Sequence, residues 1–242
     1  MDIEEIGLGP RLAWTPAKPP RREVIQGRYV RLEPVDAVRH ASDLFELSHG
    51  PKGDPTIWIY MGYGPFADIA SFKTWLVERA ASTDPLFYTV IDEASGKAAG
   101  MASFLRIVPA DGVIETGHIW FTPVLQRTRQ ATEAIFLMGK YAFDTLGNRR
   151  FEWKCNARNA PSRRAAERFG FTFEGIFREH MIIKGRNRDT AWYSIIDRDW
   201  PAIKAAFEAW LDPANFDSAG REKKKLAAMQ FAAPRPFGPD EH

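Results

Sequence analysis

The sequence has 242 residues, of which 45% are hydrophobic, and its formal net charge is +2 at pH 7. This length predicts one domain with extensions, and the hydrophobic content predicts a packed globular body rather than a disordered chain. The nearly balanced charge gives no general reason to expect nucleic acid or an anionic membrane as a partner.

The single cysteine, Cys155, excludes an intramolecular disulfide framework, and no Cys/His cluster has the spacing of a structural zinc site. The first residues are acidic and lack the apolar core of a signal peptide. The sequence also contains no run of about 18 apolar residues that would predict a membrane span. We therefore expect a cytoplasmic protein that binds no metal, no membrane and no nucleic acid.

The N-terminal third is predicted to hold an extended arm, one strand and two helices. A proline-rich composition in residues 1–23 favours the arm, which Trp14 could tether. Alternating or periodic apolar residues then predict a strand over 28–33 and helices over 37–48 and 67–82.

The middle of the chain is predicted to form an antiparallel meander that leads into a long helix. Turn residues at 93–97 and 109–112 separate three apolar strands, which cover 86–92, 98–108 and 113–121. The third strand stops at Pro123, and an apolar stripe with helical spacing follows over 131–146.

A basic loop lies between this strand and this helix. Its residues are Gln126, Arg127, Thr128, Arg129 and Gln130. Because a helix N-terminus has unpaired backbone N–H groups and the positive end of a dipole, two arginines and a threonine hydroxyl there suit an anionic group such as a phosphate. The alternative, which the loop alone favours, is an ordinary strand-to-helix connection with solvated arginines.

The rest of the chain continues with short strands and helices. The predicted strands cover 150–155, 171–177, 179–184 and 190–196, and the predicted helices cover 163–169 and 200–211. A lysine run and several prolines then indicate a mobile C-terminal tail over 212–242. A strand-helix-strand crossover inside an otherwise antiparallel meander predicts an α/β fold with a mixed, mostly antiparallel sheet flanked by helices.

Two stretches carry a resemblance to a known family. Gln126, Arg129 and Ala131 follow the spacing Arg or Gln, two residues, Gly, one residue, Gly or Ala, although Arg129 stands at the first glycine position. The stretch 159–171, which ends with a Gly-Phe pair, matches more closely. The sequence over 27–211 therefore resembles the GCN5-related N-acetyltransferases, and more narrowly the branch of ribosomal-protein alanine and serine N-acetyltransferases.

The resemblance implies an enzyme that transfers an acetyl group from acetyl-CoA to an amine, with 24–211 as the catalytic domain. It implies that the sheet separates between its fourth and fifth strands to admit the pantetheine arm, and that backbone N–H groups near Phe121 hold the thioester carbonyl. Asn159 would bind the pantetheine or assist the active site. The loop that begins at Gln126 would hold the pyrophosphate through Arg127, Thr128, Arg129, Gln130, Ala131 and Thr132.

Acyl transfer to an amine needs a base for the amine and a proton for the departing thiolate. Glu115 is the preferred base, because strand alternation puts it on the same face as Phe121 if no bulge intervenes. Its alternative role is a cross-strand ion pair, and His118, on the opposite face, is the competing base. Many members of the family have a tyrosine that acts as the general acid where this chain has Ala166. The nearest hydroxyl that could replace it as the acid is that of Ser162, whose alternative role is a helix N-cap.

The acceptor amine is expected to lie against the aromatic loop between the first two helices. Trp58, Tyr60 and Tyr63 of this loop either line a binding cleft or, as is commoner for such rings, close the core. The acceptor would be a small-molecule amine or a peptide N-terminus, and the enzyme would act as a monomer or homodimer. Because of Arg129 and Ala166, the alternative is a non-catalytic CoA-binding or protein-interaction module on the same fold.

Overall fold

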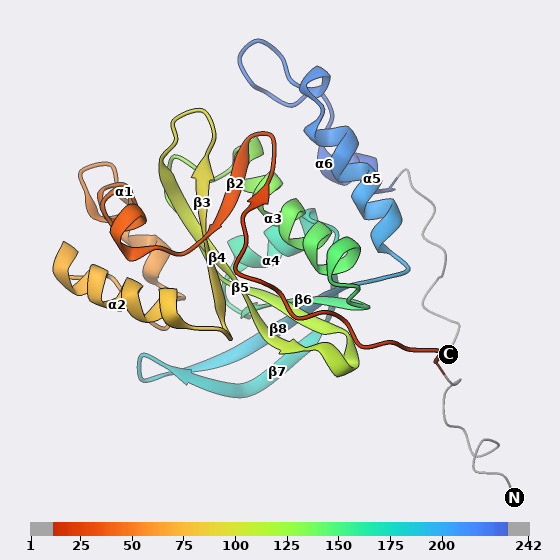
Figure 1. Cartoon of the computed structure of the whole chain (residues 1–242), viewed down its shortest axis with the longest axis horizontal. Coiled ribbons are helices and arrows are strands. Elements are labelled where there is room, and N and C mark those ends of the chain that lie inside the picture. Colours follow the sequence, from red (N-terminus) through yellow and green to blue (C-terminus); the bar gives the residue numbers. More distant parts are fainter. Residues whose placement is uncertain (1–11, 232–242) are drawn as a thin grey trace, which may run out of the picture.

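A computed structural model gives the structure of residues 12–231 (Figure 1). The strands in this part of the chain are β1 (Ile25–Gln26), β2 (Val30–Pro34), β3 (Leu86–Asp92), β4 (Ala98–Val108), β5 (Val113–Phe121), β6 (Arg150–Asn156), β7 (Thr172–Ile183) and β8 (Arg186–Ile196). They form one sheet in the order β1-β2-β3-β4-β5-β6-β8-β7. All neighbours pair antiparallel except β5 and β6, which pair parallel. This mixed, mostly antiparallel sheet confirms the predicted fold class.

Helices cover both faces of the sheet. They are α1 (Ala37–His49), α2 (Ile69–Ala81), α3 (Arg129–Lys140), α4 (Ala160–Arg168), α5 (Trp200–Leu211) and α6 (Leu226–Phe231), with short turns η2 (Pro55–Trp58), η3 (Pro109–Asp111), η4 (Tyr141–Thr145) and η5 (Pro213–Asn215). Figure 1 shows α1 and α2 on one side of the sheet and α3 and α5 on the other. Each side has its own core, which includes Leu44 and Trp120 under α1 and α2, and Phe151 and Phe207 under α3 and α5. Every helix within residues 12–231 is too short or too polar to cross a lipid bilayer.

The predicted helix boundaries shift for two helices. The helix predicted over 131–146 begins at Arg129 and changes to a π-helical turn at Tyr141. The helix predicted over 163–169 begins at Ala160, because the asparagine before it caps the first turn. Both helices therefore start closer to the preceding strand than the apolar stripes indicate.

The strands predicted over 171–177 and 179–184 form one long strand, β7. Its pairing with β8 shifts register between Phe177 and Met181, and Glu179 has a φ of 50°. This bulge breaks the alternation of side chains without ending the ladder, so the sequence pattern reads as two strands.

A buried glutamate ties the first strands to α3. Glu133 accepts hydrogen bonds from three consecutive backbone N–H groups, those of Arg28 (3.0 Å), Tyr29 (2.6 Å) and Val30 (2.8 Å). A Cβ atom on Gly27 would lie 2.5 Å from the backbone oxygen of Val30 and 2.7 Å from Glu133 Oε2, so the turn needs glycine. The β1–β2 turn is consequently held against the first turns of α3.

The N-terminal segment 12–23 contains no helix or strand. Trp14 Nε1 donates a hydrogen bond to the backbone oxygen of Ala110 at 2.7 Å, which attaches the segment to the β4–β5 turn. Residues 1–11 of the predicted arm lie outside the described residues.

The C-terminal segment 212–231, predicted as the start of a tail, carries η5 and α6. Leu226 is buried in the core beneath α5. Residues 232–242 of the predicted tail lie outside the described residues.

The two parallel strands separate part of the way along their length. β5 and β6 pair from Val113 with Arg150 to Thr116 with Trp153, and no pairing joins their remaining residues. Because both strands continue beyond this point, a gap opens between their ends. This is the separation that the resemblance implies, and it lies beside the start of α3.

Candidate active site

The start of α3 presents backbone N–H groups that have no hydrogen-bond partner within residues 12–231. They belong to Arg127, Thr128, Arg129 and Gln130, whereas the N–H of Ala131 donates to Thr128 Oγ1 at 3.1 Å. Arg127 has a φ of 61°, a left-handed conformation that is uncommon for a residue other than glycine and that turns neighbouring N–H groups toward one side. Together with the positive end of the helix dipole, these groups are suited to an anionic ligand.

The side chain of Arg129 lies beside this site against two aromatic rings. Its guanidinium carbon is 4.4 Å from the centroid of the Tyr29 ring and 5.4 Å from that of Phe216. Gln126 Nε2 donates to the backbone oxygen of Phe121 at 2.8 Å and so joins the loop to the end of β5. The arginine at the family's glycine position therefore adds a positive charge next to the loop, where the two rings hold it.

A cleft of about 1340 Å³ connects the start of α3 with the gap between β5 and β6. Its walls come from the η2 loop, the end of β5, the start of α3, α4 and the segment after α5. All the predicted site residues except Glu115 line this cleft, namely Phe121, Gln126, Arg127, Thr128, Arg129, Gln130, Ala131, Thr132, Asn159 and Ser162.

Ser162 lies on α4 in the wall of the cleft. Trp153 Nε1 donates to Ser162 Oγ at 3.0 Å, so the hydroxyl proton can be donated either to the Cys155 sulfur or to a ligand in the cleft. The alternative role of Ser162 as helix N-cap is wrong, because Asn159 is the N-cap and its side chain accepts a hydrogen bond from Ser162 N at 3.1 Å. Burial raises the pKa of the neighbouring Cys155 thiol, and a hydrogen bond with Ser162 opposes this rise.

Glu115 lies outside the cleft lining, in a buried network of ion pairs. Its Oε2 atom is 2.8 Å from Lys154 Nζ and 3.2 Å from Arg106 Nε. Lys154 also pairs with Glu152 at 2.5 Å, and the lysine side chain is only 4% exposed. Burial raises the pKa of the Glu115 carboxyl, and the charge of Lys154 opposes this rise. The geometry is that of the ion-pair alternative, and a role for Glu115 as base stays a prediction.

A bulge at His118 explains why strand alternation predicts the wrong face of β5 for Glu115. His118 has a φ of 51°, and the pairing of β5 with β4 shifts register beside it. Before the bulge, Ile114 packs in the core under α3, so its neighbour Glu115 faces away from α3. After the bulge, Phe121 packs against that same core. Glu115 and Phe121 therefore lie on opposite faces of the sheet.

His118, the competing base, also faces α1 and α2 and does not line the cleft. Its Nδ1 atom is 3.3 Å from the Tyr63 hydroxyl, and its ring centroid is 5.1 Å from that of Phe87. Burial lowers the pKa of His118 to about 4, and the positive charges of Arg79 and Arg188 add to this effect. The imidazole is therefore neutral at pH 7 and only weakly basic.

The aromatic loop before α2 contacts both the segment before α4 and the β7–β8 hairpin. The Tyr60 hydroxyl donates to the backbone oxygen of Arg158 at 3.0 Å, and Lys184 Nζ donates to that of Trp58 at 2.9 Å. Tyr60 lines the cleft, whereas Trp58 is buried and Tyr63 packs against it in the core under α1 and α2. One of the three rings thus faces the cleft and two close the core.

One wall of the cleft was not predicted from the sequence. Phe216, Arg221 and Glu222 line the cleft beside Trp210, although they follow the last predicted helix. An aromatic residue within a polar segment is the only local signal, and the fold alone brings this segment to the start of α3. Within residues 12–231, no three His, Cys, Asp or Glu side chains are grouped in a way that could hold a metal ion.

Known proteins share both the fold and the sequence. The acetyltransferase (GNAT) domain family matches residues 30–172. A GCN5-related N-acetyltransferase from Brucella melitensis is 52% identical with a TM-score of 0.88, over 90% of this chain and 99% of that chain. A protein from Chromobacterium violaceum, described as a probable acetyltransferase of the GNAT family, is 46% identical with a TM-score of 0.75, over 81% of this chain and 97% of that chain. YdaF of Bacillus subtilis, whose name places it among ribosomal N-acetyltransferases, is 28% identical over 109 residues, which are 45% of this chain and 59% of YdaF.

The separated strands and the unpaired N–H groups at the start of α3 match the arrangement that the resemblance implies for an acyltransferase. Because the family match covers more than half of the chain, the chain belongs to the acetyltransferase (GNAT) family and is an enzyme of the N-acetyltransferase type. The resemblance seen in the sequence is therefore confirmed.

Proposed function

We propose that this enzyme transfers the acetyl group of acetyl-CoA to a primary amine, carried by a small molecule or by a protein N-terminus. The observation that carries the proposal is that the unpaired N–H groups of α3 and the gap between β5 and β6 open onto one cleft. A ligand with an anionic group and an extended arm can occupy both at once.

The residues at the start of α3 fit the diphosphate of acetyl-CoA, the acetyl donor of this family. The four unpaired N–H groups can each donate to a phosphate oxygen, and hydrogen bonds to charged groups contribute about 1.5–3 kcal/mol each. Arg164 and Arg168 on α4 line the same cleft and add positive charge. When bound, acetyl-CoA supplies the acetyl group as an activated thioester.

The chain provides groups for the separate requirements of acyl transfer. A neutral amine attacks the acetyl carbonyl carbon, the bond to sulfur breaks, and the sulfur leaves as a thiolate that takes up a proton. We expect the backbone near Phe121 to hold the carbonyl oxygen and the Ser162 hydroxyl to donate the proton to sulfur. We expect the amine to lose its proton to water and not to Glu115, the base predicted from the sequence, because Glu115 is paired with Lys154 and lies outside the cleft lining.

A buried tryptophan N–H group in the wall of the cleft favours a peptide N-terminus as the acceptor. Trp120 lines the cleft, and its Nε1 atom is buried without a hydrogen-bond partner among the described residues. A peptide N-terminus brings a carbonyl oxygen next to its amine and could accept from this group, which a simple alkylamine cannot. The name of YdaF points in the same direction.

The proposal also covers the setting in which the enzyme works. We propose residues 24–211 as the catalytic domain of a monomeric or homodimeric enzyme in the cytoplasm. Cys155, the only cysteine, is buried and free, which is compatible with a reducing compartment.

Thiol release from acetyl-CoA tests the proposal with a panel of small amines and peptides that have free N-termini. We expect acceptor-dependent release that is fastest with peptides. In Ser162→Ala, kcat should fall by about tenfold to a hundredfold with little change in the KM for acetyl-CoA. Ser42→Ala, which removes an exposed hydroxyl on α1, is the matched control. Binding of acetyl-CoA in a calorimeter without turnover of any acceptor would instead identify a non-catalytic module.

A further inference from the structure

Residues 213–225, which we name the C-terminal wall, close one side of the cleft beyond α5. Phe216, Arg221 and Glu222 of this wall line the cleft together with Trp210 of α5. The family match ends at residue 172, so membership of the family does not account for the wall.

Hydrogen bonds give the C-terminal wall a defined shape. Asn215 is buried, and its Nδ2 atom donates to the backbone oxygens of Trp210 at 3.0 Å and Lys224 at 3.2 Å. Its Oδ1 atom accepts from Lys224 N at 3.0 Å. Phe216 and Glu222 form an isolated β-bridge that closes the turn. The wall is therefore a folded part of the cleft.

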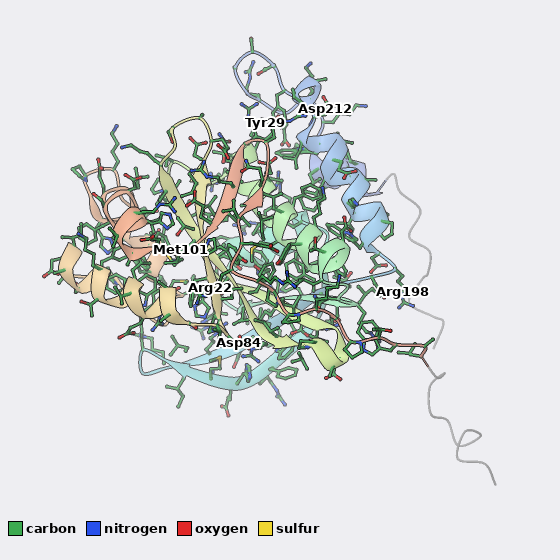
Figure 2. All side chains as sticks on the ribbon, viewed as in Figure 1. Arg22, Tyr29, Asp84, Met101, Arg198 and Asp212 are labelled. Atoms are coloured by element: carbon green, nitrogen blue, oxygen red, sulfur yellow. The ribbon has the colours of Figure 1, made fainter. Side chains whose placement is uncertain are left out.

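Arg129 connects the C-terminal wall with the start of α3. Its guanidinium lies between the rings of Phe216 and Tyr29, at 5.4 Å and 4.4 Å from their centroids. The Tyr29 hydroxyl donates to the backbone oxygen of Leu211 at 3.0 Å, and Figure 2 shows Tyr29 and Asp212 at the same end of the molecule. The wall thus lies directly beside the unpaired N–H groups.

Aromatic rings and guanidinium groups pack against one another along this side of the cleft. The Phe216 and Trp210 ring centroids are 5.1 Å apart, and the guanidinium carbon of Arg168 lies 5.1 Å from the Trp210 centroid. Trp210 Nε1 donates to Glu222 at 2.6 Å, which fixes the indole. Aromatic faces and guanidinium planes stack on nucleobases, and arginines pair with phosphates. The surface is therefore suited to a phosphorylated nucleoside.

The order of the parts along the cleft matches the order of groups along acetyl-CoA. The gap between β5 and β6 comes first, the N–H groups of α3 follow, and the C-terminal wall comes last, as do the acyl-pantetheine, the diphosphate and the adenosine of the coenzyme. We propose that the C-terminal wall binds the adenosine end of acetyl-CoA. In this arrangement Phe216 lies against the adenine, and Arg221 lies beside the 3′-phosphate of the ribose. Arg221 is 80% exposed and pairs with Asp217 at 2.9 Å, so it can turn toward a stronger anion. This inference rests on the proposed function, because it places the diphosphate at α3.

The proposal can be tested in the full chain by comparing two acetyl donors. These are acetyl-CoA and S-acetyl-pantetheine, and the second lacks the nucleotide. Phe216→Ala should raise the KM for acetyl-CoA about tenfold, and Arg221→Gln should raise it about threefold. Neither variant should change turnover of S-acetyl-pantetheine. Lys73→Ala removes an exposed charge on α2, away from the cleft, and should leave both donors unaffected. Equal effects on both donors, or no effect on acetyl-CoA, would overturn the proposal.

A binding measurement separates failure of this inference from failure of the proposed function. Free 3′-phospho-ADP, the nucleotide part of coenzyme A, should bind to the wild type about tenfold more tightly than to Phe216→Ala, whether or not the enzyme turns over an acceptor. Thermal unfolding checks that Phe216→Ala is folded, and Arg221→Gln supplies a surface variant that leaves the packing intact. If 3′-phospho-ADP binds equally to all variants while the wild type acetylates amines, the wall has no role in binding the nucleotide and only the proposed function survives.

Discussion

The two faces of the sheet differ in whether their polar groups near the gap have partners. On the α3 face, the N–H groups from Arg127 to Gln130 have no partner in the described part of the chain and open onto a cleft. On the face toward α1 and α2, Glu115, Lys154 and Glu152 are buried and paired with one another. Unpaired groups at an open surface are available to a ligand, whereas the paired and buried groups stabilise the fold at the point where β5 and β6 begin to separate. The comparison teaches that a titratable residue near the gap need not be catalytic, because its partners and its burial can keep it from a ligand.

The largest expected effect comes from breaking the buried network. Lys154→Met removes the buried cation that pairs with both Glu115 and Glu152, and it should lower the free energy of unfolding by about 3–5 kcal/mol. Lys204→Met is the matched control, because Lys204 pairs with Asp144 at 2.6 Å but is 32% exposed, and it should cost about 0–1 kcal/mol. Urea unfolding measures both values. Similar losses for the two variants would remove the distinction between the faces.

The pH dependence of stability gives the next largest effect. The pKa of His118 is about 4 in the folded protein and 6.5 in the unfolded chain, so the unfolded chain binds more protons between these values. The free energy of unfolding should therefore fall as pH decreases from 6.5 to 4, with about 3 kcal/mol of that fall due to His118.

His118→Gln isolates this contribution, because glutamine does not titrate in the same range. Urea unfolding of the variant and the wild type at a series of pH values should give curves that converge toward low pH. Parallel curves would mean that the histidine is solvated and not buried beside Tyr63 and Phe87.

Glu115→Gln separates the ion-pair role from the catalytic one. Since Lys154 keeps Glu152 as a partner, the loss of stability should be smaller than in Lys154→Met, about 2 kcal/mol, with kcat of the folded enzyme little changed. Urea unfolding and steady-state kinetics on the same preparation measure both quantities. A fall in kcat of a hundredfold or more without a loss of stability would show that Glu115 acts as the base.

The smallest effect concerns the cap of α3. Thr128→Ala removes the side-chain oxygen that accepts from Ala131 N and should lower the free energy of unfolding by about 1 kcal/mol. Thr128→Ser keeps the hydroxyl and is the control. Acetyl-CoA should protect both variants against unfolding, but Thr128→Ala less, because its N–H groups are less well ordered. Equal protection would separate the cap from coenzyme binding.

Local patterns were sufficient to predict much of the fold. The meander and the start of a helix after Pro123 depend on turn residues and apolar spacing that are visible in short windows, whereas the pyrophosphate role of Gln126 to Thr132 comes from the family resemblance. Since the loop and the helix are continuous in sequence, their side chains share one cleft without any long-range information.

The remaining features depend on bulges and distant contacts. The bulge at His118 reverses which side of β5 faces α3. The residue types at this position do not predict a bulge. Ser162 suits a helix cap as well as Asn159 does, and only the backbone decides which of them caps α4. Phe216 reaches the cleft through packing against Arg129 and Trp210, so its position follows from the fold alone.

Amide chemical shifts test the central claim most directly, which is that the N–H groups at the start of α3 hold the diphosphate of acetyl-CoA. Adding acetyl-CoA to isotope-labelled protein should shift the backbone amide signals of Arg127, Thr128, Arg129 and Gln130 strongly, and those of Glu152 and Lys154 much less. If saturating acetyl-CoA left the four signals at the start of α3 unmoved, the diphosphate would bind elsewhere and the assignment of the cleft would be wrong.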